Sequence, residues 1–134
     1  MFTPTKWNTA EDKAKFARHF QRFVEKGFPE SMFNKAFYNR MSMMNGHIAH
    51  YNQGGFYGAQ FGTSLRRAEF LSDWANSRAN GDPEYTWSDV EKVLAIWLRD
   101  NPQYEERERS QHNQIIEHIE RAELARLSQK YATT

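Results

Sequence analysis

Hydrophobic side chains recur at intervals of three and four residues along most of this chain, which is the spacing of one face of an α-helix. The first such run predicts a helix from about residue 10 to residue 26. Thr9 and Asp12 have the spacing of a capping box at its start, and Gly27 is placed to end it. Its expected buried face consists of Phe16, Ala17, Phe20, Phe23 and Val24.

A break at Phe28 and Pro29 separates this helix from the next. Proline suits the first turn of a helix, where a backbone N–H has no partner, so we predict a second helix over about residues 30–45. Gly46 is placed to end this helix. Its apolar side consists of Phe33, Phe37, Tyr38, Met41 and Met44.

The segment 46–62 differs from the rest of the chain, because it holds five glycines, four aromatic residues and two histidines. Glycine is unfavourable inside a helix and suits positions where the backbone bends or approaches something closely. We therefore predict a short helix or extended piece over residues 47–52, then an irregular loop to Gly62 that allows a minor hairpin. This segment is the first candidate for a functional site.

Two further helices are predicted in the second half of the chain. Thr63 or Ser64 can cap a helix over about residues 64–79, whose apolar residues include Phe70 and Trp74. The run Asn80-Gly-Asp-Pro83 is a turn.

The next helix is predicted over about residues 87–100, because Thr86 and Asp89 have the spacing of a second capping box. Asn101 and Pro102 end it, since the residue before a proline is disfavoured in a helix. Its apolar face consists of Val90, Val93, Leu94, Trp97 and Leu98.

A last helix is predicted over about residues 103–131. Up to Gln114 its only apolar residue is Tyr104, and such a helix is either exposed on most sides or held by charge pairs. Its second half must pack on this domain or on a second copy of the chain, and the second case would be a homodimer through this helix. The apolar residues concerned are Ile115, Ile116, Ile119, Leu124, Leu127 and Tyr131. The sequence thus predicts an all-α fold of about five helices in one domain, residues 1–134.

Composition narrows the class of protein further. The 134 residues include no cysteine, which excludes disulfides and thiolate catalysis and fits a cytoplasmic protein. No apolar run has the length of a signal peptide or a membrane span. Residues 1–67 hold 10 basic and 4 acidic residues, a net charge of +6, whereas residues 68–134 hold 8 and 13, a net charge of −5. The basic half can attract a polyanion, or the two halves can neutralise each other on folding.

Four cations recur at spacings of three and four along the first predicted helix, and we call them the basic row. Cations so placed repel each other weakly, which points to an anionic partner. With Lys35, Arg40 and aromatic side chains of the glycine segment, the row predicts contacts to DNA or RNA. We assign Phe56 and Phe61 to the core and keep Tyr51 and Tyr57 as candidate binding residues. The basic row consists of Lys15, Arg18, Arg22 and Lys26.

His47 and His50 lie three residues apart and would share a face if their stretch is helical. Two imidazoles at this spacing can bind a metal ion or exchange protons in acid–base catalysis. A metal would need further ligands from His19, Glu117, His118 or water, and no acidic residue stands between the two histidines. We therefore predict ordinary hydrogen-bonded histidines, no metal and no cofactor.

The glycines at 54 and 55 precede the predicted third helix by about eight residues, and Arg66 and Arg67 fall inside it. A phosphate-binding loop needs its glycines directly before a helix, with a lysine and a hydroxyl, so we reject a P-loop.

The run Gly54-Gly55-Phe56-Tyr57 followed by Ala59 resembles a motif of the plasmid antirestriction proteins of the ArdB/KlcA type. Asn52 matches the asparagine of that motif with one inserted residue, Gln53. The resemblance covers less than a tenth of the chain. It implies a small, cofactor-free protein of a phage or plasmid that blocks a host defence nuclease of the restriction or CRISPR type.

Three hypotheses follow, in this order. The first is a non-enzymatic inhibitor or adaptor that binds a host nuclease complex through the glycine and aromatic segment and its charged faces. The second is a small nucleic-acid-binding protein that uses the basic row. The third is a metal- or histidine-dependent nuclease. The candidate binding residues outside the basic row are His47, His50, Tyr51, Asn52, Gly54, Gly55 and Tyr57.

Overall fold

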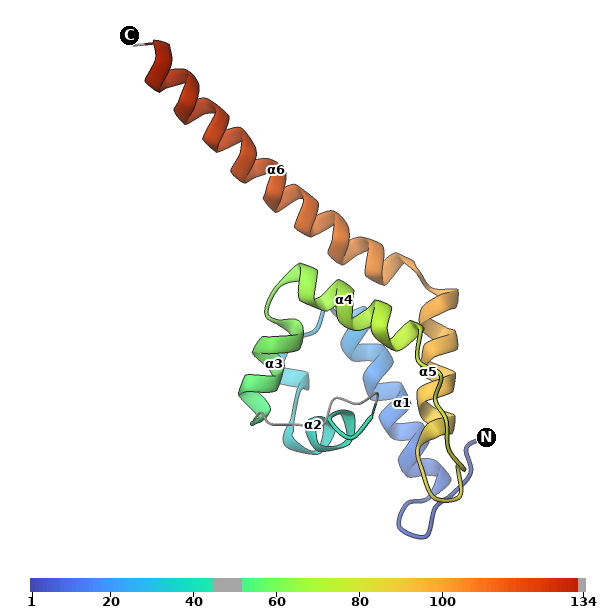
Figure 1. The fold of residues 1–134 in the computed structure, drawn as a ribbon. Coiled ribbons are helices and arrows are strands. Elements are labelled where there is room, and N and C mark those ends of the chain that lie inside the picture. The colour runs from blue at the N-terminus through green and yellow to red at the C-terminus, as the bar shows by residue number, and fades with distance from the viewer. Residues whose placement is uncertain (45–51, 133–134) are drawn as a thin grey trace.

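A computed structural model describes residues 1–44 and 52–132 of the chain. These residues form six α-helices and one short 3-10 helix and contain no strand, which confirms the all-α prediction with one helix more than expected (Figure 1). The α-helices are α1 (Ala10–Glu25), α2 (Lys35–Met41), α3 (Gln53–Phe61), α4 (Ser64–Ala75), α5 (Ser88–Asp100) and α6 (Gln103–Ala132).

The first helix forms as its sequence predicts. The Thr9 hydroxyl accepts a hydrogen bond from the Asp12 N–H at 3.0 Å, and the Asp12 carboxylate accepts one from the Thr9 N–H at 2.8 Å. Gly27 takes a left-handed backbone with φ +82°, which favours glycine and ends α1. The Phe28 N–H then returns to the Phe23 carbonyl at 2.8 Å, and Phe28 is buried.

The predicted second helix over 30–45 is wrong in its extent, because the segment divides into two elements. A 3-10 turn spans Glu30–Met32, and α2 is limited to Lys35–Met41. Asn34 separates them: its backbone is extended, and its side chain accepts from the Phe37 N–H at 2.9 Å as the cap of α2. Gly46, the expected end of the helix, lies outside the described residues.

The irregular loop predicted up to Gly62 is also wrong, since residues 53–61 form α3. The Asn52 side chain caps this helix by accepting from the Gly55 N–H at 2.7 Å. Phe56 and Phe61 are each 1 % exposed, as predicted, and their burial outweighs the weak helix preference of the glycines. No hairpin forms over residues 52–62. Residues 47–51 of the predicted short piece lie outside the described residues.

Two boundaries in the second half also differ from the prediction. Helix α4 is capped by Thr63 as expected, but it ends at Ala75 rather than at residue 79. The Asn76 side chain donates to the Ser72 carbonyl at 2.8 Å. Ala79 has a left-handed φ of +41°, and a right-handed helix cannot continue through such a residue.

The expected capping box at Thr86 does not form. Helix α5 begins at Ser88, after Trp87, with no side-chain cap. The Asp89 carboxylate that would complete the box instead accepts from Thr3 and Lys13. Tertiary contacts with Thr3 and Lys13 therefore prevent Asp89 from completing the capping box.

Aromatic rings fill the core between α1, α2, α3 and α4. Phe23 of α1 is fully buried, and its ring centroid lies 5.1–5.8 Å from those of Phe28, Phe33, Phe37 and Phe61. Trp74 of α4 packs on Phe20 at 4.6 Å. These contacts hold the face of α1 opposite the basic row.

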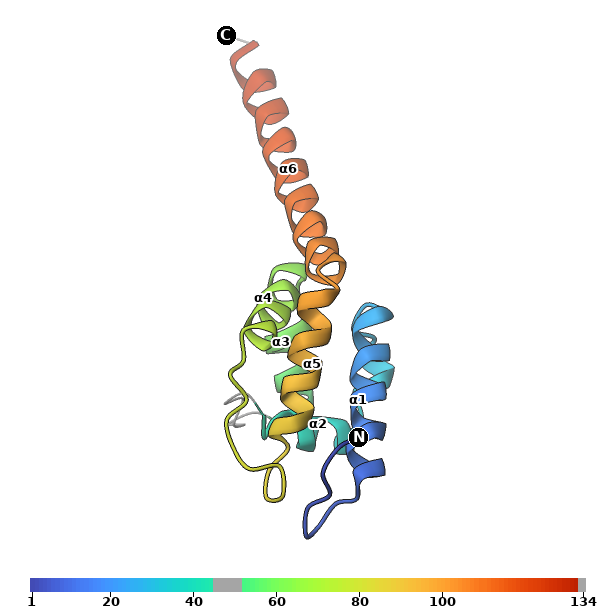
Figure 2. The ribbon, with the colours of Figure 1, turned by 90° about the vertical axis from the view of Figure 1, so that its right-hand side faces the viewer.

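Helix α6 packs on α4 at its beginning and then projects away from the other helices (Figures 1 and 2). Tyr104 stacks on Trp97 of α5 at 5.3 Å, and Glu108 is buried. We call residues 113–132 the outer half of α6, and every residue in it is exposed except Leu127, which is half-buried. None of the helices in the described residues is long and apolar enough to cross a membrane.

Candidate nucleic-acid interface

The basic row lies on the outward face of α1, opposite the aromatic core. All four of its side chains are exposed. Arg18 forms an ion pair with Glu11 at 2.7 Å, in which both side chains are more than half exposed. Within the described part of the chain, Lys15, Arg22 and Lys26 form no ion pair. Folding therefore leaves most of this positive charge available to an external anion.

A groove of about 720 Å³ runs between α1 and α2 beside the basic row. Three cations of the row line it from α1, and Arg40 lines it from α2. Glu11 and Asp12 lie at the same groove and leave it with an excess of positive charge. Phe16, Phe37 and Trp87 form its apolar lining.

Arg40 is fixed in place at this groove. Its guanidinium lies 4.0 Å from the centroid of the Trp87 ring and donates to the Asn8 side-chain oxygen at 3.4 Å. Trp87 donates its indole N–H to the same oxygen at 3.2 Å. Burial lowers the pKa of Arg40 from its usual value, and the Asp12 carboxylate opposes this shift. An arginine stays protonated at neutral pH, so Arg40 contributes a positioned positive charge.

His19 also lines the groove, but its ring is engaged in the fold. Its Nε2 lies 2.7 Å from the Met32 carbonyl oxygen, and a carbonyl oxygen can only accept, so Nε2 carries the hydrogen. The ring also packs edge-on against Phe37 at 4.4 Å. His19 therefore positions the 3-10 turn against α1.

The other predicted site residues that the structure describes do not line this groove. Asn52 caps α3, and Gly54 and Gly55 lie exposed in its first turn. His47, His50 and Tyr51 lie outside the described residues, so their predicted roles stay predictions. Of Gly54, Gly58 and Gly62, only Gly62 meets a close approach, since a Cβ there would collide with the Gly58 carbonyl.

Tyr57 serves the fold through its hydroxyl group, which donates to the Phe28 carbonyl at 2.5 Å. Burial raises the pKa of Tyr57, and the negative charge of Glu30 raises it further. Its ring packs against Phe33 and Phe61 at 5.5 and 5.6 Å. Tyr57 thus fixes the left-handed corner after α1 to α3.

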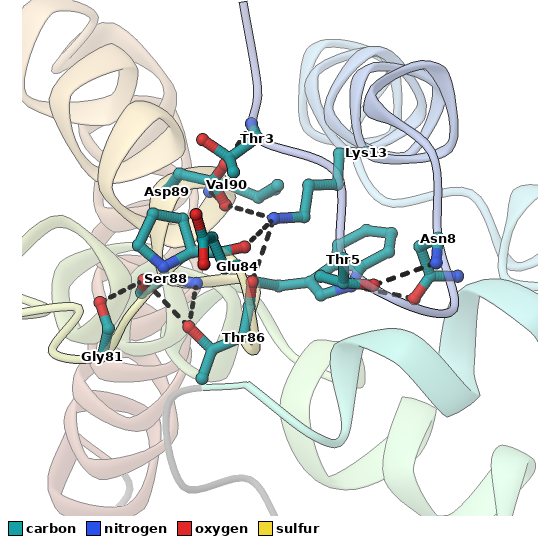
Figure 3. A network of polar contacts seen from close by, with 12 residues as sticks. Thr3, Thr5, Asn8, Lys13, Gly81, Glu84, Thr86, Ser88, Asp89 and Val90 are labelled. Atoms are coloured by element: carbon teal, nitrogen blue, oxygen red, sulfur yellow. Dashed lines mark hydrogen bonds and ion pairs between the residues drawn. The ribbon is translucent and has the colours of Figure 1, made fainter.

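Lys13 is a buried residue that the sequence analysis did not single out (Figure 3). Its Nζ donates to the Pro83 and Thr86 carbonyls at 3.0 and 2.9 Å and lies 3.0 Å from the Asp89 carboxylate. These contacts join α1 to the loop before α5. The signal was present, because Lys13 precedes Phe16 and Ala17 by three and four residues and so lies on the apolar face.

A second buried carboxylate, Glu108, anchors the beginning of α6. Its Oε1 lies 3.2 Å from Arg67 Nε and 3.4 Å from Arg107 Nη2. Arg67 donates to the Phe61 carbonyl at 2.9 Å, and Arg107 donates to the Val24 carbonyl at 2.9 Å. The two arginines therefore donate to carbonyls at the ends of α3 and α1, and the Val24 carbonyl also accepts from the Gly27 N–H at 3.1 Å. Of the two alternatives that the sequence left open for this polar part of α6, exposure or charge pairing, the structure contains charge pairs here.

Lys13–Asp89 and Arg67–Glu108 each join the basic half of the chain to the acidic half. The two halves thus neutralise each other in part, at buried positions, and the basic row takes no part in this. Among residues 1–44 and 52–132, no group of three or more histidine and carboxylate side chains is placed to hold a metal ion. His118 and Glu117 lie on the outer half of α6, away from His19 (Figure 1).

No protein-family model, characterised protein or solved structure matches this chain. The resemblance to the ArdB/KlcA antirestriction proteins therefore stays a prediction.

Proposed function

We propose that this protein binds double-stranded nucleic acid through the phosphate backbone, using the basic row and the adjoining groove between α1 and α2. The observation that supports this best is that Lys15, Arg22 and Lys26 are exposed and have no ion-pair partner among the described residues. Anions are attracted most strongly where cations are not already neutralised.

The length of the row suits a duplex. From Lys15 to Lys26 there are eleven residue steps, or about 17 Å at about 1.5 Å per residue. One strand of a duplex places a phosphate every ~3.4 Å along its axis, so the row spans about five phosphates. Arg40 adds a cation held against Trp87 at the edge of the groove.

A duplex is favoured over a single strand because the phenylalanines that line the groove, Phe16 and Phe37, are buried and offer no free ring face to a base. Phe56 and Phe61, from the aromatic segment, are in the core, and the Tyr57 hydroxyl is bonded to the backbone. Trp87 is covered on one face by Arg40. Single-strand binding relies on exposed aromatic faces on which bases stack. The proposed contacts are therefore independent of base sequence.

The test is a titration of the protein with a labelled duplex at several salt concentrations. With about four phosphates neutralised, the slope of log affinity against log salt should be close to about −3.6, so raising salt fourfold lowers affinity about 150-fold. A variant with alanine at all four positions of the basic row should lose most of this slope. A matched single strand of the same length should bind more weakly.

A charge-matched control shows whether the surface or only the net charge matters. Lys6, Arg66, Arg78 and Lys92 are exposed and lie outside the basic row, so changing these four to alanine removes the same charge. This control should retain the slope of the unchanged protein. Equal losses in both variants, or no binding at low salt, would refute the proposal.

Absence of duplex binding would favour a protein with an acidic surface as the partner of the basic row. The inhibitor of a host defence nuclease would then be the first hypothesis to pursue, by isolating the row's partner from host extracts. That hypothesis and the cytoplasmic location remain predictions of the sequence. That hypothesis assigned binding to an irregular loop in the glycine and aromatic segment, but residues 53–61 of this segment form a helix.

A further inference from the structure

The outer half of α6 presents large apolar side chains that nothing in the described chain covers. Ile116 is 40 % exposed, Ile119 is 56 % exposed and Leu124 is 65 % exposed. By contrast, the core residues Leu71 and Leu94 are exposed by 1 % or less. The sequence alone left open whether this segment packs on its own domain, and the structure places it beyond the domain (Figures 1 and 2).

Two exposed ion pairs form within the helix in this segment. Glu117 and Arg121 form an ion pair at 2.6 Å, and Glu123 and Arg126 form another at 2.6 Å. Such exposed pairs stabilise a helix only weakly, and most helical stability in proteins comes from the tertiary packing of an apolar face. An additional helix packed along the apolar side chains would supply the tertiary contacts that the segment lacks.

We propose that the outer half of α6 pairs in antiparallel orientation with the same segment of a second copy of this chain. The argument for a second copy is charge complementarity. Residues 113–120 contain two glutamates and no lysine or arginine, a net charge of −2, whereas residues 121–132 contain three basic residues and one glutamate, a net charge of +2. Antiparallel pairing places opposite charges level with each other, and parallel pairing places like charges together.

One antiparallel register also aligns the apolar side chains. It places Ile116 level with Leu127 and Ile119 level with Leu124, and it places Glu117 level with Arg126. These four apolar residues fall within an arc of about 140° at about 100° per residue. The register places Glu120 level with Glu123, whose carboxylate is already bonded to Arg126.

The shape of the molecule permits this arrangement. The outer half is 20 residues long, or about 30 Å, and extends clear of the other helices (Figures 1 and 2). In an antiparallel pair the two sets of packed helices lie at opposite ends. The basic row lies on α1, so this proposal does not depend on nucleic-acid binding.

The first test is the molar mass of the full chain in solution, measured by sedimentation over a wide range of concentrations. We expect a monomer–dimer equilibrium. A variant with Ile119→Glu and Leu127→Glu should raise the dissociation constant about 100-fold or more, because it puts charge into the apolar interface. Gln114→Glu with Gln129→Glu is the control, since it adds the same charge on the opposite side of the helix.

The control should change the dissociation constant by no more than about threefold. Circular dichroism of each variant establishes that α6 is still helical. A chain that stays monomeric up to millimolar concentration would overturn the proposal and leave this face to a different protein. Equal effects of the two variants would overturn the assignment to the apolar face.

The orientation has its own test, which the absence of cysteine makes direct. An Ile116→Cys protein and an Leu127→Cys protein of different size are mixed and oxidised. Antiparallel pairing predicts a disulfide between the two different proteins, because residues 116 and 127 are level in that register. Disulfides formed mainly between identical proteins would overturn the antiparallel arrangement.

Discussion

Helix α1 and the outer half of α6 use similar residue types in opposite ways. In α1, Phe20 and Phe23 are fully buried, whereas Ile119 on α6 is 56 % exposed. The charges differ in the reverse sense: Lys15 and Arg22 on α1 have no ion-pair partner in the described residues, but Glu117 on α6 is paired within its helix.

The difference separates two kinds of surface. On α1 the apolar face is used by the fold, and unpaired charge remains for an external anion. On α6 part of the charge is paired within the helix, and apolar surface remains for another helix. Exposed charge alone is ordinary, and it is the alignment of these cations on one face of α1, beside the groove, that makes the basic row a candidate site.

We call helices α1 to α5 and the beginning of α6 the body of the molecule. The largest loss of stability should come from changing Lys13, which joins α1 to the loop before α5 within this body. Lys13→Met removes the partner of Asp89 and leaves the Pro83 and Thr86 carbonyls without a donor. We expect the free energy of unfolding to fall by about 3–5 kcal/mol, measured by urea denaturation. Lys15→Met, two residues away and exposed, is the control and should change it by less than about 0.5 kcal/mol. Similar losses in both variants would contradict the role of Lys13.

A smaller loss is expected at Glu108, where the body meets α6. Glu108→Gln keeps the shape of the side chain but removes the negative charge between Arg67 and Arg107. The loss should be about 2–3 kcal/mol, because both arginines retain their hydrogen bonds to backbone carbonyls. The exposed neighbour Glu106 provides the control through Glu106→Gln, and thermal unfolding of the two variants compares them. Equal melting temperatures would show that Glu108 does not anchor α6.

Tyr57→Phe should cost about 1 kcal/mol, since it removes one hydrogen bond to Phe28 and keeps the ring. The effect should depend on pH. The pKa of Tyr57 is raised in the folded state, so above about pH 10 the unfolded chain loses its proton first and stability falls as pH rises. The variant should lack this alkaline component, as measured by urea denaturation from neutral pH to pH 11. An identical alkaline slope in both proteins would contradict the buried hydrogen bond.

The smallest effect on the body should come from breaking the outer half of α6. Ala122→Pro disrupts that helix locally, but the four tryptophans all lie in the body, at positions 7, 74, 87 and 97. At monomer concentrations, helicity should fall while the tryptophan-detected melting temperature stays the same. Ala68→Pro, at a buried position of α4, should by contrast lower that temperature strongly. A lowered melting temperature for Ala122→Pro would show that the outer half contributes to the body.

Several elements were predictable because local and tertiary preferences agree. The capping box at Thr9 and the left-handed Gly27 define α1 from neighbouring residues alone. Failures occurred where tertiary contacts competed with local signals. The burial of Phe56 and Phe61 made residues 53–61 helical in spite of their glycines, and Lys13 took the carboxylate that was expected to cap α5.

The basic row itself was predictable, since helical spacing places its four cations on one face. The groove beside it was not, because Arg40 and Trp87 are 47 positions apart in the sequence and meet only in the fold. The same holds for Lys13 and Glu108. Lys13 lies on the apolar face of its helix and Glu108 follows Tyr104 by four residues, but Asp89 and Arg67, which pair with them, come from distant segments.

The sequence by itself determined the helical class, the row of cations on α1 and the apolar residues of α6, because helical period is a property of neighbouring residues. Only the tertiary structure decided which of these surfaces remain free. A helix face becomes core when another element packs on it, and contacts between distant segments govern that choice. Phe23 of α1 is therefore buried among four aromatic rings, while Ile119 of α6 is exposed to solvent.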